Sequence, residues 1–231
     1  MRYAGVLFDL FGTLVTPYRT REHQQMLREC ALHLGLEFED CNRVSGETYP
    51  ARMRGAFPTI RDNLALMAQT LGKQPTSDRL AKAAACYERF TLESLVPVAH
   101  AIDVLSWLSS NDVRLGLVTN CAPDIPTLWD QTAFAPYFDH CAFSCRVGYV
   151  KPEPEIYRTA LGALGLDAHE TLYVGDGSDD ELAGAARCGL DAVLISVDLS
   201  NTYDSHRPTV ADWQGKRVAD LIQLRHLLSR A

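Results

Sequence analysis

The sequence predicts an α/β fold: a Rossmann-like parallel sheet with helices on both faces, and a helical bundle inserted after the first strand. Short apolar runs alternate with helical patterns from about residue 96 onward, and one such run opens the chain. This alternation is typical of a parallel sheet covered on both faces. Between residues 20 and 95 the pattern is helical with almost no strand signal. We therefore expect an α/β core from residues 1–16 and 96–231, and a helical cap domain from residues 17–95.

The expected elements follow from apolar spacing and from the Gly and Pro residues that interrupt it. The first strand is expected at residues 3–9, and three or four helices that pack as antiparallel neighbours come next. Later helices are expected at 98–109, 125–132, 153–164, 180–188 and 218–228. Later strands are expected at 113–118, 141–143, 171–174 and 192–195, with a long polar loop at 196–215.

Composition restricts the partners. The 231 residues carry a net charge of −7, and no block of Lys or Arg stands out, which argues against nucleic acid and acidic membranes. The start of the chain lacks a signal-peptide pattern, and no uncharged apolar run approaches the length of a membrane span. The seven cysteines include no Cys-x-x-Cys pair. We expect a cytoplasmic monomer or homodimer that acts on a small molecule.

Four segments at or near the ends of predicted strands carry polar groups that suit phosphoryl chemistry. They hold Asp9, the pair Thr119-Asn120, Lys151 before Pro152, and the acidic run at 176–181. The carboxyl ends of parallel strands meet where open α/β sheets bind ligands, so these groups are expected to lie together. Hydroxyl and loop N–H groups bind anionic oxygens, a lysine neutralises them, and clustered carboxylates suit Mg²⁺.

Each segment also has an ordinary structural interpretation. Asp9 and Thr119-Asn120 could serve turns, Lys151 could be a solvated surface residue, and Asp179 and Asp180 could be favoured by the dipole of the following helix. Taken together, these interpretations require four independent coincidences in one order along the chain. We therefore favour a shared chemical site.

In their order and wording these segments resemble the haloacid dehalogenase-like hydrolase superfamily. The resemblance rests on Asp9-Leu10-Phe11-Gly12-Thr13, Thr119-Asn120, Lys151-Pro152, and Gly175-Asp176 followed by Glu181-Leu182-Ala183-Gly184-Ala185. The helical insertion at 17–95 is similar to the cap of one large subgroup. The resemblance implies an Mg²⁺-dependent phosphatase that acts on a small phosphorylated metabolite through an aspartyl-phosphate, which water then hydrolyses.

The resemblance also implies roles at the ends of the first two strands and at Lys151. Asp9 would be the nucleophile and a metal ligand, and the backbone carbonyl of Phe11 would be a second ligand. Gly12 and Thr13 would form the turn beside the substrate. Thr119 and the N–H of Asn120 would hold the phosphoryl group, and Lys151 would neutralise its charge.

In the fourth segment the resemblance implies the remaining metal ligands. Asp176 would reach Mg²⁺ directly or through water. The second acid would be Asp180 or Glu181, and Glu181 is preferred because the following Gly184-Ala185 fits that register.

The chain departs from the pattern at Phe11. Phosphatases of this family usually carry a second Asp there, which moves a proton to the leaving group, and such a group contributes about 10²–10⁴-fold. An aromatic residue at this position resembles the haloacid dehalogenases, which displace halide without metal. A 2-haloacid dehalogenase using Asp9 is therefore the second hypothesis, and a phosphate- or metabolite-binding protein without turnover is the third. The acidic fourth segment favours the phosphatase.

Two arginines of the helical segment, Arg52 and Arg54, are candidates for binding an anionic part of the substrate. Residues two apart on a helix face different sides. We therefore expect at most one of them to enter the site.

Overall fold

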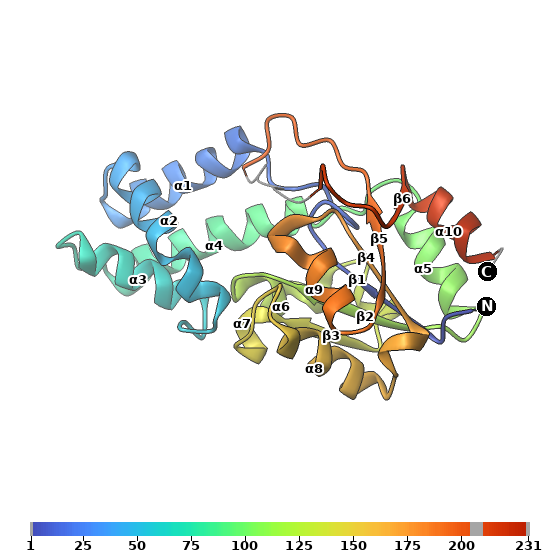
Figure 1. Ribbon diagram of the computed structural model, residues 1–231. Coiled ribbons are helices and arrows are strands. Elements are labelled where there is room, and N and C mark those ends of the chain that lie inside the picture. The colour runs from blue at the N-terminus through green and yellow to red at the C-terminus, as the bar shows by residue number, and fades with distance from the viewer. Residues whose placement is uncertain (1, 204–209, 230–231) are drawn as a thin grey trace.

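The computed structural model describes residues 2–203 and 210–229, and its central element is one parallel sheet (Figure 1). The strand order is β3-β2-β1-β4-β5-β6, and every neighbouring pair is parallel. The strands are β1 (Gly5–Phe8), β2 (Arg114–Thr119), β3 (His140–Phe143), β4 (Thr171–Gly175), β5 (Asp191–Ile195) and β6 (Lys216–Val218). The predicted α/β fold is confirmed.

Helices cover both faces of the sheet, which explains why its inner strands are largely apolar. Val6 and Phe8 of β1 belong to an apolar cluster with α5 and α10, whereas Leu7 faces a second cluster with α8 and α9. From residue 101 onward the α-helices are α5 (Ala101–Ser109), α6 (Asp124–Leu128), α7 (Ser144–Val147), α8 (Pro154–Leu164), α9 (Glu181–Arg187) and α10 (Leu221–Ser229). Short 3₁₀ turns lie at η1 (Trp129–Gln131), η2 (Ala135–Tyr137), η3 (Ala168–Glu170) and η4 (Ser178–Asp180).

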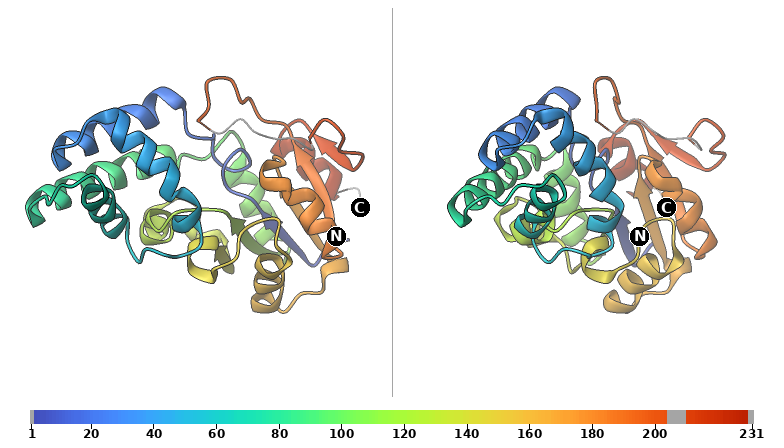
Figure 2. Two further views of the ribbon diagram at one scale, coloured as in Figure 1. Left: turned by 60° about the vertical axis from the view of Figure 1, so that its left-hand side comes forward. Right: turned by 90° about the vertical axis from the view of Figure 1, so that its left-hand side faces the viewer.

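Four consecutive helices lie between β1 and α5. They are α1 (Thr20–Leu34), α2 (Phe38–Met53), α3 (Ile60–Thr70) and α4 (Ser77–Ser94), and we call them the four-helix segment. The segment buries its own apolar cluster, which includes Leu27, Leu64 and Met67. Both views of Figure 2 place it to one side of the sheet. The carboxyl ends of the strands point toward it, so ligand groups can come from both parts.

Differences from the sequence prediction lie mostly at element ends and at the sheet edge, and the short helix α7 and the 3₁₀ turns η2 and η3 were not predicted. The helix expected at 125–132 is the short α6 followed by the 3₁₀ turn η1, and the last helix begins at Leu221 rather than at 218. Strand β6 was missed because its three residues follow a polar stretch with no apolar run. Part of the loop expected at 196–215 lies outside the described residues. No helix in the described part of the chain is long and apolar enough to cross a membrane.

Candidate active site

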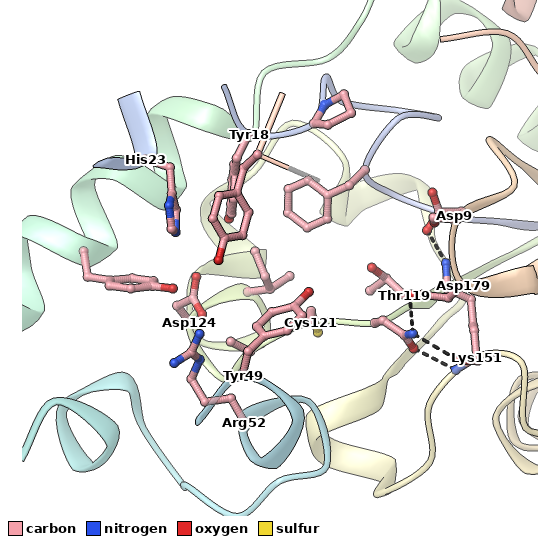
Figure 3. Close-up of a pocket in the computed structure, with 18 residues that line it drawn as sticks. Asp9, Tyr18, His23, Tyr49, Arg52, Thr119, Cys121, Asp124, Lys151 and Asp179 are labelled. Atoms are coloured by element: carbon pink, nitrogen blue, oxygen red, sulfur yellow. Dashed lines mark hydrogen bonds and ion pairs between the residues drawn. The ribbon is translucent and has the colours of Figure 1, made fainter. Parts of the chain in front are cut away.

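A cavity lies between the carboxyl ends of the strands and the four-helix segment (Figure 3). Asp9, Thr119 and Lys151 line it from the sheet side, and His23 and Arg52 line it from the four-helix segment. Figure 3 shows the first three at one end of the cavity and the last two at the other. The cavity therefore has a sheet end and a helix end, which we describe in turn.

Asp9 is held rigidly at the tip of β1. Its N–H donates to the carbonyl of Val174 at 2.9 Å, so the backbone continues the pairing with β4 up to this residue. Its side chain is 2% exposed. Oδ1 accepts a hydrogen bond from Lys151 Nζ at 2.5 Å, and Oδ2 accepts one from Thr13 Oγ1 at 3.1 Å. Both oxygens thus have fixed directions, which suits a nucleophile that must meet its target in line.

Lys151 is the buried cation of the sheet end. Its Nζ also donates to Glu181 Oε2 at 2.5 Å. Its backbone N–H donates to Asn120 Oδ1 at 2.8 Å, and Asn120 Nδ2 donates to the carboxylate of Asp179 at 2.7 Å. Asn120 therefore ties the loop after β2 to the loop that carries the lysine.

Three buried carboxylates surround this single ammonium group. Asp9, Asp176 and Glu181 each offer an oxygen, and these oxygens all lie within 4.8 Å of one another. Burial raises the pKa of Asp9, and burial followed by the charge of Asp9 raises the pKa of Glu181 to about 8. Burial alone would lower the pKa of Lys151, but the charges of Asp9 and Glu181 raise it, so the ammonium form is retained. The cluster carries excess negative charge, and its all-oxygen donor set fits Mg²⁺.

The two candidates for the second acid occupy different positions. Glu181 is fully buried and belongs to the carboxylate cluster, and it also accepts hydrogen bonds from Tyr173 Oη at 2.7 Å and from the Gly177 N–H at 2.9 Å. Asp180 is half-buried, has φ of +53°, and is not part of that cluster. The placement is consistent with the register that favoured Glu181.

Gly12 allows Asp176 to approach the loop after Asp9. Its φ is +89°, and a Cβ on it would lie 1.9 Å from Asp176 Oδ2. Any larger residue would push the Asp176 carboxylate away from Asp9. The glycine is therefore a requirement of the carboxylate cluster as well as of the turn.

Thr119 ends β2 beside these groups. Thr119 is 1% exposed, and its buried hydroxyl has no hydrogen-bond partner in the part of the chain that the structure describes. Native proteins rarely leave such a group unsatisfied, so an unpaired hydroxyl that lines a cavity indicates a ligand oxygen.

Phe11 leaves the sheet end without a proton donor two residues after Asp9. Its half-buried ring lines the cavity, and its centroid lies 4.8 Å from that of Tyr18. The ring is thus an apolar part of the cavity wall that contacts an aromatic residue of the helix end. The metal-ligand role expected for the Phe11 carbonyl stays a prediction.

The two candidate arginines are separated by the structure. Arg52 is 3% exposed and lines the cavity. Arg54 lies outside the cavity, exposed, where its Nη2 pairs with Glu153 at 2.6 Å. The two-residue spacing turns one side chain inward and the other outward, so Arg54 is no longer a candidate for substrate binding.

Several residues that line the helix end were not singled out from the sequence. They are mostly aromatic: Tyr18, His23, Tyr49, Tyr87 and Tyr203. In the sequence they read as ordinary members of helical apolar stripes or of loops. No local signal separates an aromatic residue that faces a cavity from one that faces the core.

Comparisons with known proteins agree with this geometry. A family model described as haloacid dehalogenase-like hydrolase matches residues 3–189. The glyceraldehyde 3-phosphate phosphatase of Methanocaldococcus jannaschii is 27% identical over 202 residues, 83% of this chain and 84% of its own. The phosphoglycolate phosphatase of Salmonella typhimurium is 29% identical over 199 residues, 80% of this chain and 78% of its own.

Solved structures share the fold. A HAD phosphatase from Thermococcus onnurineus superimposes with a TM-score of 0.62 at 23% identity, covering 97% of both chains. The L-2-haloacid dehalogenase of Xanthobacter autotrophicus with chloropropionic acid covalently bound gives 0.63 at 20% identity, covering 98% of both. At this identity the likeness concerns the fold and does not separate the two activities. The sheet, the four motif segments and the family match together show that the chain is an enzyme of the haloacid dehalogenase-like hydrolase family.

Proposed function

We propose that the protein is an Mg²⁺-dependent phosphatase that acts on a small phosphomonoester and uses Asp9 as its nucleophile. The observation that carries the proposal is the convergence of Asp9, Lys151 and the unpartnered Thr119 hydroxyl at one end of a cavity. The named relatives that cover most of this chain are phosphatases, which supports the same reaction.

The proposed mechanism follows from charge. An anionic carboxylate must approach an anionic phosphate, and Lys151 offsets part of the repulsion while it fixes the direction of Asp9 Oδ1. The Thr119 hydroxyl donates a hydrogen bond to a phosphoryl oxygen. Asp9 attacks phosphorus, the ester oxygen leaves, and water later attacks phosphorus to release phosphate and restore the carboxylate.

The metal would be held by Asp9 and Asp176, with Glu181 as the third buried carboxylate. When bound, Mg²⁺ supplies positive charge that neutralises the phosphoryl oxygens. Lys151 bridges Asp9 and Glu181, so its ammonium group offsets part of the repulsion between these two carboxylates and holds them at the sheet end.

The four-helix segment, within the proposed cap domain of residues 17–95, would cover the site and exclude water from it. Arg52 and the aromatic residues of the helix end would then contact the part of the substrate that is not transferred. The cytoplasmic location, the monomer or homodimer, and the exclusion of nucleic acid and membranes stay predictions.

Phosphate release tests the proposal. Purified protein is offered p-nitrophenyl phosphate and small alkyl phosphates, with Mg²⁺ or with chelator, beside Asp9→Asn. We expect release that requires Mg²⁺ and falls by at least about 10³-fold in the variant, because the nucleophile is lost. Asp130→Asn, an exposed acid outside the cavity, is the matched control and should retain activity.

The Phe11 side chain keeps a second candidate open. A 2-haloacid dehalogenase would release chloride from a 2-chloroacid in the presence of chelator, also through Asp9. That result, without phosphate release, would replace the phosphatase proposal. Binding of phosphate with neither product released would instead favour a binding protein.

A further inference from the structure

The helix end of the cavity contains one buried basic and one buried acidic side chain that do not pair with each other. Arg52 comes from α2 and Asp124 from α6, and each is 3% exposed. Both line the cavity, and Figure 3 shows them on the same side of it, opposite Asp9. We call these two residues the distal pair.

Each member of the distal pair is fixed on one side and unsatisfied on the other. Arg52 Nη1 donates to Ser45 O at 3.0 Å, Thr48 Oγ1 at 2.8 Å and Asn63 Oδ1 at 3.0 Å, but its Nε has no partner among the described residues. Asp124 Oδ2 accepts from Thr91 Oγ1 at 2.7 Å, but its Oδ1 has no partner in the same part of the chain. One donor and one acceptor are therefore left over in a buried place.

His23 adds a third unsatisfied atom. Its Nδ1 is buried and has no partner within residues 2–203 and 210–229, and burial together with the charge of Arg52 lowers the pKa of His23 to about 4, so the ring is neutral. The ring stacks on Tyr18, with centroids 6.2 Å apart, and lies 4.1 Å from Tyr203. The helix end is thus a small polar pocket with aromatic walls, and among the described residues that line this end Arg52 and Asp124 are the only arginine, lysine, aspartate or glutamate.

We propose that the distal pair binds an α-hydroxy or α-amino carboxylate, which is the non-transferred end of the substrate. The carboxylate accepts a hydrogen bond from Arg52, and the neighbouring hydroxyl or ammonium donates to Asp124 Oδ1. Such a group presents an anionic acceptor and a donor on adjacent carbons. This arrangement matches the donor of Arg52 and the acceptor of Asp124, which lie on the same side of the cavity and do not pair with each other. This inference rests on the proposed function, because it assumes that a phosphate occupies the other end.

Asp124 does not take the place of the acid missing at Phe11. The leaving oxygen must lie beside phosphorus, next to Asp9, whereas Figure 3 places Asp124 at the opposite end of the cavity. The ring of Phe11, two residues after Asp9, also lines the cavity. Asp124 is therefore a specificity residue.

A set of primary alkyl phosphates tests this pocket. Two carry both groups (3-phosphoglycerate and O-phospho-L-serine), one carries a carboxylate without a donor (3-phosphonooxypropanoate), and one carries hydroxyls without a carboxylate (glycerol 1-phosphate). All four have an alkoxide leaving group, so the missing acid at Phe11 affects them alike. We expect kcat/KM to be higher by about 10²-fold for substrates with both groups, because a built polar site rejects analogues that leave it unpaired.

Single variants test separately whether Asp124 binds the hydroxyl or ammonium and whether Arg52 binds the carboxylate. Asp124→Asn should abolish the preference for 3-phosphoglycerate over 3-phosphonooxypropanoate, and Arg52→Gln should abolish the preference for 3-phosphoglycerate over glycerol 1-phosphate. Both changes should act mainly on KM. Arg43→Gln, an exposed arginine of the same helix that pairs with Asp40 and Glu47, and Asp130→Asn are matched controls that should preserve both preferences. If Arg52→Gln fails to fold, Arg52→Lys and the near-isosteric Asp124→Asn carry the test, with thermal melting as the check.

Binding separates failure of this pocket from failure of the proposed function. Titration of Asp9→Asn with 3-phosphoglycerate and with glycerol 1-phosphate measures recognition without turnover. Tighter binding of the former, with no phosphate release from any substrate by the wild type, would overturn the phosphatase and support the pocket. Equal affinities and equal kcat/KM values across the set would overturn the pocket and leave the phosphatase standing. Retained preferences in Asp124→Asn would remove Asp124 from the proposal.

Discussion

At the scale of single residues, the site depends on a position with no side chain. Gly12 has φ of +89°, and a Cβ on it would meet Asp176 Oδ2 at 1.9 Å. Replacement by alanine therefore imposes backbone strain and also displaces a carboxylate of the proposed metal site.

We expect Gly12→Ala to lower stability by about 1–2 kcal/mol through its backbone conformation. Activity should fall on the order of 10²-fold, since small misplacements of reacting groups have that effect. Gly72→Ala is the control, because Gly72 also has positive φ, +70°, but no atom within 4 Å of an added Cβ. Denaturant unfolding and phosphate release measure the two effects. Equal loss of activity in both variants would show that strain alone, and not Asp176, matters.

A second residue-scale prediction concerns pH. Burial and the charge of Asp9 raise the pKa of Glu181 to about 8, from 4.5 in water. A carboxyl whose pKa is raised in the folded state holds its proton more tightly there, so its stabilising contribution is complete below pH 4.5 and is lost as the pH rises through about 8.

Without divalent cation, we therefore expect the melting temperature to fall as the pH rises from about 4.5 to about 8. Mg²⁺ should reduce the fall, because a cation compensates the clustered carboxylates. Thermal melts in chelator and in Mg²⁺ measure this, with Glu181→Gln as the comparison. An unchanged fall in Glu181→Gln would assign the titration to other groups.

At the scale of elements, the sheet was predictable because buried parallel strands carry their signal locally. Residues 5–8 and 171–175 are continuous apolar runs that end at Asp9 and Asp176, so strand, turn and candidate chemistry lie in one stretch of sequence. Strand β6 has no such run, because two of its three residues are exposed. Its place is decided by pairing with β5, which is a tertiary contact.

The sheet end of the candidate site was predictable from the sequence, and the helix end was not. Asp9 and Thr119 were found because topology brings strand ends together, and Lys151 was found in the loop between α7 and α8, on the same side of the sheet. The helix end was not found, because the direction of Arg52, Arg54 or His23 depends on how the helices pack, and the spacing of residues on one helix does not fix this. Periodicity could state only that Arg52 and Arg54 face different sides.

Arg54 provides the element-scale prediction. It connects the end of α2 to the loop before α8 through a partly exposed ion pair with Glu153. Because exposed pairs contribute little, Arg54→Ala should change stability by less than about 1 kcal/mol and leave KM unchanged. Urea unfolding and steady-state kinetics measure these quantities. A raised KM confined to anionic substrates would return Arg54 to the site.

At the scale of the whole molecule, the four-helix segment and the sheet bury separate apolar clusters. The cluster of the segment includes Leu27, Leu64 and Met67, and those of the sheet include Phe8 and Leu7. Parts with separate cores can open independently. Such opening is what a proposed lid over a cavity requires, because substrate must enter between the two parts.

Leu64→Ala tests this independence. Leu64 is 1% exposed, so its truncation should cost about 2–5 kcal/mol, and the loss should concentrate in α1–α4 while β1, β2 and β4 keep their protection. Hydrogen–deuterium exchange on the intact chain resolves the two parts. Leu32→Ala, at a side chain that is 74% exposed in the same segment, should leave both patterns unchanged. A uniform rise in exchange across helices and strands would show one cooperative unit, and lid opening would then require a rigid-body motion without local unfolding.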